Sequence, residues 1–288
     1  MPLAVGGDTA TPHNRSLRLA IMAQHIACGN FVLDVGCGRG EYLLGLLECT
    51  PNALGIDTAE KKLEDCWTQH PKLRQRALQV SADAMPFPSG QFDVVIVNEV
   101  LEHIPNQDGA LREIWRVLKP GGKLLLFCPN RFYPFETHGL LIRGTLRKWL
   151  PFLHYLPPSL ASHFAIEAVA RNYWPKEATQ LLESHGFCIQ QLGFVPQTFE
   201  NISRSQPALI GPMRPLLRGG VAAAAKLPLI RVFVSVSTFL MATKDVTNNA
   251  EIDAHTEWPE KVPPATRSTN HYLAIFSPID CAWVNSNR

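Results

Sequence analysis

The stretch from Phe31 to Glu41, FVLDVGCGRGE, constrains the fold of this chain more than any other. Its apolar run ends in Asp34 and is followed by glycines at alternate positions, Gly36, Gly38 and Gly40. We interpret it as a β-strand, a tight turn and the start of a helix. Because glycine has no Cβ, such a turn can adopt positive φ and lets a ligand approach the backbone closely. The stretch therefore predicts a ligand cradle at the end of a strand.

The spacing of these glycines argues against a dinucleotide ligand. Counted from Gly36, the dinucleotide fingerprint Gly-x-Gly-x-x-Gly/Ala requires Gly or Ala at position 41, where the chain has Glu41. A pyrophosphate would meet that carboxylate, whereas Asp34 places an anion where a ligand ammonium can pair with it. S-adenosylmethionine carries such an ammonium and no phosphate. The segment resembles motif I of the class I S-adenosylmethionine-dependent methyltransferases, although an ordinary strand-to-helix turn is compatible with the same residues.

The composition is that of a globular chain. Its 288 residues, 46% hydrophobic and 18% charged, leave room for one large α/β domain with insertions. The net charge of +2 comes without a dense Lys/Arg block, so we expect no nucleic-acid partner. Seven cysteines without Cys-x-x-Cys spacing argue against a disulfide framework and a structural zinc site. Residues 1–11 lack the features of a secretory signal, and we expect a cytoplasmic protein.

Strand and helix patterns alternate along most of the chain. A leading helix is expected over Arg15 to Cys28, before the first strand. Further strands are expected at 52–57, from Ala77, at 91–98 and at 123–128, with helices at 41–48, from about 59 and at 108–118. Lys119-Pro-Gly-Gly is interpreted as the cap of the last of these helices. A helix from Trp174 to a stop at Gly186 and strands at 187–194 and 232–243 complete the set.

The resemblance extends over roughly residues 31 to 128. The segments that carry it are VLDVGCGRG, GID, ADAMPFP, FDVVIVNEVLEHI and LREIWRVLKPGGKLLL. The sequence is most similar to the group that includes ubiquinone-biosynthesis and other small-molecule methyltransferases. Alternation of strands and helices with short loops predicts an α/β fold with a doubly wound parallel sheet. The resemblance makes this a Rossmann-like, seven-stranded, mostly parallel sheet with helices on both faces, with S-adenosyl-L-methionine as cofactor.

The cofactor residues are expected at the carboxyl ends of the strands. Asp34, Gly36 and Gly38 are assigned to the methionine end. The Asp57 carboxylate can accept hydrogen bonds from both hydroxyls of a ribose. Its alternative role is the N-cap of the following helix. The resemblance implies that Asp83 faces the adenine amino group and that the backbone amide of Ala84 faces a ring nitrogen. Cys37, Thr58 and Asn98 complete the expected cofactor site.

The methyl acceptor decides whether the enzyme needs a base. A hydroxyl acceptor must lose its proton, and histidine suits that role near neutral pH. The candidates for this base are His103, just beyond the fourth strand, and His138, with Glu136 as the residue that orients it. An acceptor that is already a carboxylate or an amine, or a carbon acid activated elsewhere, would need none of them. No metal site is expected.

The regions outside this pattern are the expected source of substrate specificity. We divide the chain into an N-terminal helix (1–30), a methyltransferase domain (31–245) and a flexible tail (246–288). Insertions at about 130–174 and 196–231 are expected to cover the substrate. The apolar stretch 216–241 contains Arg218, Lys226 and Arg231, so contact with a membrane surface is favoured over a spanning helix. The cluster Arg143, Arg147, Lys148 and Trp149 suits an anionic substrate or lipid phosphates, or simply a solvated helix face.

The sequence thus predicts transfer of a methyl group to a small-molecule or lipid-like acceptor, most readily at oxygen. The protein is expected to be a monomer or weak dimer, with possible peripheral membrane contact. RNA or protein methylation and a non-catalytic cofactor-binding protein of the same fold are the alternatives. An NAD-dependent oxidoreductase conflicts with Glu41.

Overall fold

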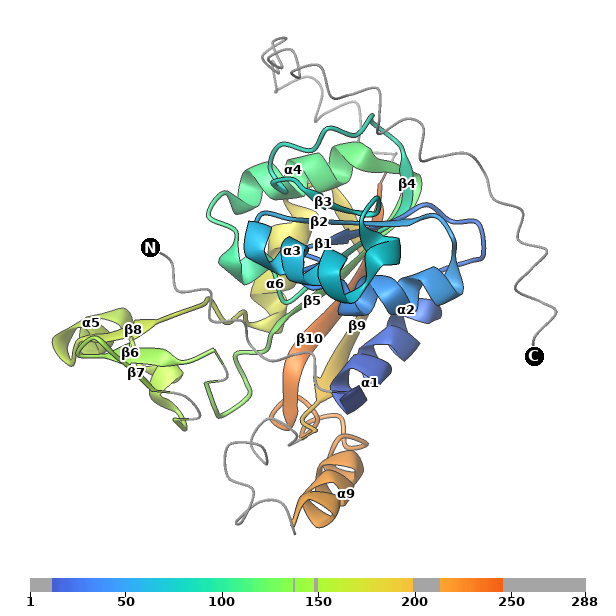
Figure 1. Ribbon diagram of the computed structural model, residues 1–288. Helices are drawn as coiled ribbons and strands as arrows, with labels where there is room; N and C mark the ends of the chain where they lie inside the picture. The colour runs from blue at the N-terminus through green and yellow to red at the C-terminus, as the bar shows by residue number, and fades with distance from the viewer. Residues whose placement is uncertain (1–11, 137, 148–149, 199–212, 246–288) are drawn as a thin grey trace.

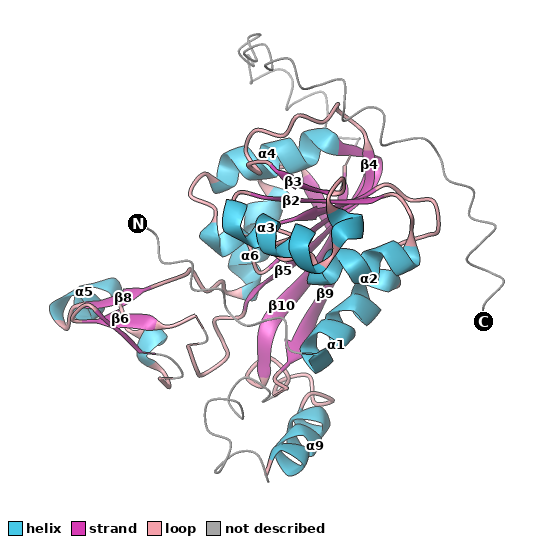
Figure 2. Ribbon diagram, viewed as in Figure 1, coloured by secondary structure: helices cyan, strands magenta, loops and turns pink. Residues whose placement is uncertain are grey.

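The computed structural model describes residues 12–136, 138–147, 150–198 and 213–245. A seven-stranded sheet in the order β3-β2-β1-β4-β5-β10-β9 forms its centre, with helices on both faces (Figures 1 and 2). The strands are β1 Val32–Val35, β2 Ala53–Asp57, β3 Ala77–Gln79, β4 Phe92–Asn98, β5 Leu118–Pro129, β9 Phe187–Pro196 and β10 Ser235–Lys244. The helices of this body are α1 Pro12–Ala23, α2 Glu41–Cys49, α3 Glu60–Gln69, α4 Gln107–Val117 and α6 Pro175–Glu183.

The expected fold class is confirmed. β1, with all four residues buried, lies between β2 and β4 and pairs with both in parallel. A strand enclosed by helices on both faces needs apolar side chains in both directions, which is why the Val/Ile run of β4 occupies the centre. β10 is antiparallel to both of its neighbours. The carboxyl ends of β1, β2, β4, β5 and β9 therefore share one edge of the sheet, which we call the carboxyl edge.

Two apolar clusters fill the two faces of the sheet. Leu33 and Val35 of β1 point to one face, where α4 and α6 pack with Ile114 and Leu182. Val32 points to the other face, among residues of α1, α2 and α3. The alternation of side chains along each strand thus assigns the helices to their layers.

Two details differ from the sequence-based expectation. The leading helix runs from Pro12 to Ala23, earlier than expected. Lys119-Pro-Gly-Gly does not cap α4, because the helix ends at Val117 and the chain turns extended at Leu118, which pairs with Phe92 of β4. The register then shifts, with Gly121 at φ 71°, so this segment is an irregular start of β5.

Both insertions leave from the carboxyl edge. The first forms a small sheet of β6 Leu140–Ile142, β7 Thr145–Arg147 and β8 Ile166–Ala168, with the short helix α5 Pro158–His163 (Figure 1). The second, between β9 and β10, contains α9 Arg214–Ala224. Lys148, Trp149 and the tail expected at 246–288 lie outside the described residues. Within the described part of the chain, no helix combines the length and apolar composition needed to cross a membrane.

A buried arginine attaches α1 to the sheet. Arg18 is fully buried, and its guanidinium donates to Asn14 Oδ1 (3.1 Å), Asn98 Oδ1 (2.6 Å), Glu99 Oε1 (3.0 Å) and Ser237 Oγ (2.5 Å). These contacts join the helix to the end of β4 and to β10. Buried charges persist only when they are paired and hydrogen-bonded in this way.

We expect Arg18→Ala to lower the free energy of unfolding by about 3–5 kcal/mol, because it leaves the buried Glu99 carboxylate without its counterion. Urea unfolding followed by circular dichroism measures this loss. Arg15→Ala on the same helix is the control, since the Arg15–Glu41 pair is 3.9 Å apart and partly exposed, and such pairs contribute about 0–1 kcal/mol. Equal effects of the two substitutions would contradict the assigned role of Arg18.

Candidate active site

The glycine turn between β1 and α2 forms the expected cradle. Gly36, Gly38 and Gly40 have φ values of 77°, 53° and 77°. The amides of Gly36 and Cys37 both donate to the carbonyl of Ile56 in β2, which fixes the turn over the neighbouring strand. A Cβ at position 36 would lie only 2.3 Å from the side chain of Val100. Glycine is therefore required there by both conformation and space.

Asp34 is buried and electrostatically uncompensated. Its Oδ2 has no hydrogen-bond partner among the described residues. Burial, and then the nearby Asp57 carboxylate, raise the pKa of Asp34 to about 8. A buried carboxyl in this condition gains from an added cation, because the opposite charge offsets the cost of ionisation. Asp34 thus fits the ammonium of S-adenosylmethionine.

The N-cap of α3 is Ala59 rather than Asp57, although the Asp57 side chain hydrogen-bonds to the turn before this helix; the ribose role of Asp57 stays a prediction. Its Oδ1 accepts from the amide of Ala59 (2.8 Å), as an N-terminal turn before α3 requires, and its Oδ2 accepts from the amide of Gly38 (2.9 Å). A carboxylate offers about four acceptor sites. Two remain for a ribose, so the contact with the turn and a contact with the sugar are compatible.

Asp83 lies in the loop after β3 with both oxygens engaged. Oδ1 accepts from Ser81 Oγ (2.5 Å) and Oδ2 from Asn106 Nδ2 (3.1 Å), and these two hydrogen bonds lower the pKa of Asp83. The amide of Ala84, expected to face an adenine nitrogen, donates to the carbonyl of Ser81 at 3.2 Å. The adenine contacts of Asp83 and Ala84 stay predictions.

The remaining expected cofactor residues lie at the same edge. Asn98 ends β4, where Arg18 and the hydroxyl of Tyr42 hydrogen-bond to its side chain. Cys37 is buried beneath the glycine turn, and burial raises the pKa of its thiol, as suits packing rather than nucleophilic chemistry. Thr58 is exposed directly after Asp57.

The three catalytic candidates lie together with a fourth residue that the sequence analysis did not select. The imidazole rings of His103 and His138 meet edge to face, with centroids 5.3 Å apart. His138 Nε2 is 3.6 Å from Glu102 Oε1, and its Nδ1 is 3.9 Å from Glu136 Oε1. Asn172 donates to Glu136, which orients that carboxylate. The added residue is Glu102, which precedes His103 in the NEVLEHI segment.

Glu102 is a buried carboxyl without hydrogen bonds to its oxygens in the described part of the chain. Burial and the neighbouring Glu99 raise its pKa well above the usual range. Ligand atoms of Glu102, His103 and His138 all lie within 4.8 Å of one another. Two imidazoles and a carboxyl can act as a proton acceptor, and they can also hold a divalent cation.

This cluster borders the cofactor loop. Val100, whose side chain fills the space above Gly36, directly precedes the 3₁₀ helix η2 Leu101–His103. The carbon chain of Lys62 lies 3.9 Å from the Cβ position of Gly38. Burial, with a smaller contribution from the charge of Lys62, lowers the pKa of His103. The glycine turn and the histidine pair are thus neighbours at the carboxyl edge.

Comparison with known proteins agrees with this geometry. A family model described as a methyltransferase domain matches residues 33–126. Demethylmenaquinone methyltransferase of Thermus thermophilus is 34% identical over 48% of this chain and 69% of its own length. Ubiquinone biosynthesis O-methyltransferase of Methylococcus capsulatus is 32% identical over 55% and 71%. The chain belongs to the class I S-adenosylmethionine-dependent methyltransferases. S-adenosylmethionine is accordingly its cofactor, and the roles of the glycine turn and Asp34 in binding it stay predictions.

Some curated relatives match only about half of their own length. The match to ubiquinone biosynthesis O-methyltransferase of Dechloromonas aromatica is 38% identical but spans 40% of this methyltransferase and 51% of the relative. Among solved structures, the [4+2]-cyclase SpnF superposes with a TM-score of 0.52 at 21% identity, covering 81% of this chain and 82% of that one. A methyltransferase from Archaeoglobus fulgidus gives 0.51 at 19% identity, covering 80% and 94%. These structural matches concern the fold alone.

We expect Gly36→Ala to lower the free energy of unfolding by about 2–4 kcal/mol, because its Cβ combines positive φ with a clash against Val100. Gly90→Ala is the matched control, since Gly90 has φ 69° and open space around its Cβ position. It should cost only about 1–2 kcal/mol of backbone strain. Chemical denaturation of both variants measures the difference, and equal losses would refute the steric requirement.

We expect binding of S-adenosylmethionine at pH 7 to release a proton, because Asp34, with its pKa near 8, must ionise to pair with the ammonium. Since the free enzyme holds this proton below the raised pKa, affinity should rise by up to about tenfold per pH unit between pH 6 and 7.5. Calorimetry in buffers of different ionisation enthalpy counts the proton. Asp34→Asn should abolish the release, and a release that persists in this variant would assign the proton to another group.

Proposed function

We propose that this enzyme transfers the methyl group of S-adenosylmethionine to a hydroxyl oxygen of a small, lipid-like acceptor. The observation that supports it most is the pair of imidazoles, His103 and His138, flanked by Glu102 and Glu136 beside the cofactor loop. A hydroxyl needs a proton acceptor when it attacks a methyl group, whereas a preformed carboxylate or free amine does not. The relatives named for ubiquinone and demethylmenaquinone also favour a lipid-like acceptor.

The residues divide the reaction between positioning and proton transfer. S-adenosylmethionine, when bound, supplies an activated methyl group with a neutral leaving group. Asp34 and the glycine turn hold its methionine end, and Asp57 its ribose, so that rate is gained by alignment. His103 faces the open side of the site, and His138 behind it is flanked by Glu102 and Glu136. In this scheme the imidazoles take the hydroxyl proton while the carboxyl groups orient the rings.

The same proposal includes peripheral contact with a membrane, because a lipid-like acceptor resides there. It also treats the protein as a monomer or weak dimer. RNA methylation would call for a basic surface with aromatic stacking positions beside the pocket. A non-catalytic protein of this fold would bind the cofactor but methylate no acceptor.

We expect His103→Gln and His138→Gln to lower kcat by about 10²–10⁴-fold on a phenolic or catecholic acceptor, while calorimetric affinity for S-adenosylmethionine stays unchanged. Release of S-adenosylhomocysteine from a panel of phenols, catechols, carboxylates and amines is the assay. His70→Gln, at the end of α3, is the control. Activity confined to amines would refute oxygen as the target, and activity confined to carboxylates would refute a hydroxyl as the acceptor.

A chelator separates two roles of the same cluster. Activity that persists in excess EDTA supports the imidazoles as the direct proton acceptor. Activity that is lost and then restored by a divalent ion would instead give Glu102, His103 and His138 the role of holding that ion.

A further inference from the structure

The exposed apolar side chains of this protein are unevenly distributed. Among the described residues, every large hydrophobic side chain that is more than a third exposed lies in 135–174 or 213–233, apart from Leu192. They are Phe135, Leu146, Phe152, Leu160, Phe164, Trp174, Met213, Leu216, Leu227, Leu229, Ile230 and Phe233. Leu216 and Leu229 are 75% and 85% exposed. Soluble surfaces rarely gather apolar residues in this way without a partner.

Two long segments that contain most of these residues carry charge of only one sign. The sequence has no Asp or Glu from 138 to 166 or from 201 to 244. The first region contains Arg143 and Arg147, both exposed, and the second contains Lys226 and Arg231, also exposed. The chain as a whole has a net charge of only +2, so this segregation is local.

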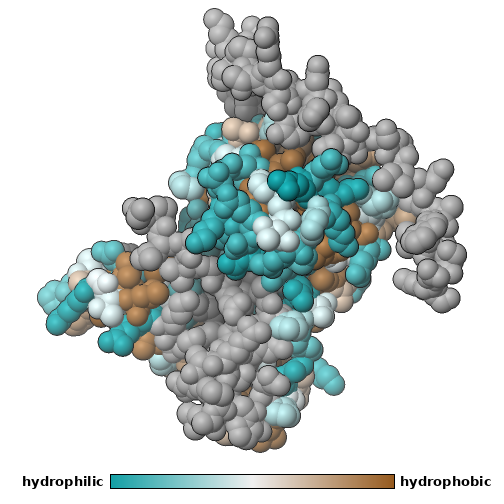
Figure 3. All heavy atoms as spheres, viewed as in Figure 1, coloured by the Kyte–Doolittle hydropathy of each residue, from teal (hydrophilic) through white to brown (hydrophobic). Residues whose placement is uncertain are grey.

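The two regions contact each other at their stems, where each leaves the carboxyl edge of the sheet. Asn130, after β5, donates to the carbonyls of Val232 and Ser235. The rings of Phe132 and Phe233 meet at 5.5 Å. Figure 3 shows brown apolar atoms over the small β6–β8 sheet. The two regions thus belong to the edge of the sheet that carries the cofactor site.

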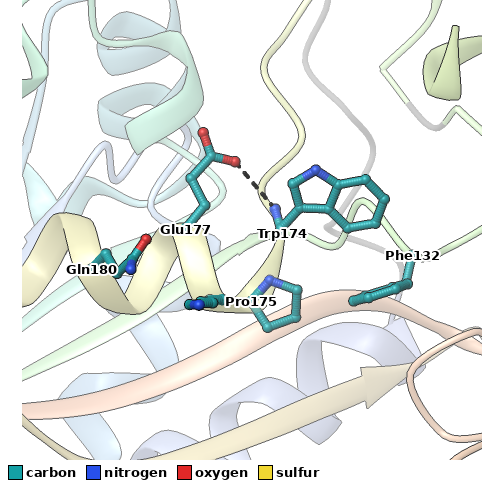
Figure 4. Close-up of a pocket in the computed structure, with 6 residues that line it drawn as sticks. Phe132, Trp174, Pro175, Glu177 and Gln180 are labelled. Atoms are coloured by element: carbon teal, nitrogen blue, oxygen red, sulfur yellow. Dashed lines mark hydrogen bonds between the residues drawn. The ribbon is translucent and has the colours of Figure 1, made fainter. Parts of the chain in front are cut away.

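An aromatic hollow lies between these stems and α6. It has a volume of about 570 Å³ and is lined by Phe132, Trp174, Pro175 and the polar residues of the first turns of α6 (Figure 4). The Trp174 ring packs on Phe132, and the guanidinium of Arg131 lies 5.2 Å from its centroid. Tryptophan beside arginine is typical of the boundary between lipid and water.

We propose that residues 140–147, 150–164 and 213–233 form a surface that docks on the anionic face of a lipid bilayer. The docking surface rests on the proposed function in one respect: it explains how a lipid-like acceptor reaches the active site. Its α9 has 11 residues, which suits a helix lying in the interface rather than spanning it. The exposed leucines enter the headgroup region while Lys226 and Arg231 meet lipid phosphates. An anionic bilayer matches both the apolar content and the uniform positive charge.

The test is co-sedimentation of the full chain with vesicles. Vesicles of phosphatidylcholine with about a third phosphatidylglycerol are compared with phosphatidylcholine alone, because anionic lipid adds attraction for each basic residue. We expect strong binding to the anionic vesicles that weakens with salt, and little binding to the neutral ones. The double variants Leu216→Glu with Leu229→Glu, and Lys226→Gln with Arg231→Gln, should each lower partitioning by about tenfold or more.

Matched controls lie on the body of the protein. Leu192→Glu changes a leucine that is 43% exposed on β9, and Lys72→Gln with Arg74→Gln neutralises exposed bases near α3. Both control variants should sediment with the anionic vesicles as the unsubstituted protein does. Affinity for S-adenosylmethionine verifies that each variant is folded.

Three results would overturn the proposal: no sedimentation with anionic vesicles, equal loss in the controls, or loss of a dimer rather than of lipid binding in the leucine variant. Vesicle binding requires neither acceptor nor methyl transfer. His103→Gln should therefore sediment normally even if it is inactive, which separates this proposal from the proposed reaction.

Discussion

The active site depends on the burial of one cation, the guanidinium of Arg18. It contacts residues from three elements that are far apart in the chain, namely α1, the end of β4 and the start of β10. Removing a guanidinium from water is expensive, so the contacts must be satisfied together. Glu99 adopts φ 55° to make its contact, a strained conformation that the buried pair compensates. The next residues, Val100 to His103, are placed by that turn.

Carboxyl groups outnumber cations at this edge of the sheet. Asp34, Asp57, Glu99 and Glu102 all lie there, and their mutual repulsion and burial raise the pKa values of Asp34 and Glu102. Arg18 compensates mainly Glu99, so Asp34 stays without a cation among the described residues. The site is thereby suited to a ligand with an ammonium and a sulfonium, since binding such a ligand relieves the repulsion.

Short sequence patterns predict the strands and helices of this protein well, but they predict its long-range side-chain contacts poorly. A few adjacent residues determine the local structure of the Val/Ile run of β4 and of the glycine turn after β1. Arg18, in contrast, looks like an ordinary polar position of an amphipathic helix, because its partners outside α1 are 80 to 219 residues away. Glu102 could be found only through its neighbour in the NEVLEHI segment, and Lys119-Pro-Gly-Gly was misassigned because strand pairing with Phe92 overrides its capping chemistry.

The fold uses different segments for the methyl donor and for the acceptor, which is why the acceptor is the feature that the sheet determines least. The sheet fixes the cradle for the donor, and the same sheet underlies a [4+2]-cyclase that superposes on 81% of this chain. What distinguishes one such protein from another must therefore come from segments that the sheet does not dictate. Here those segments are the two insertions, and His138 connects the first of them to the site, since it lies on its stem and packs on His103 of η2. In the proposed reaction, selection of the acceptor and removal of its proton would thus depend on the same insertion.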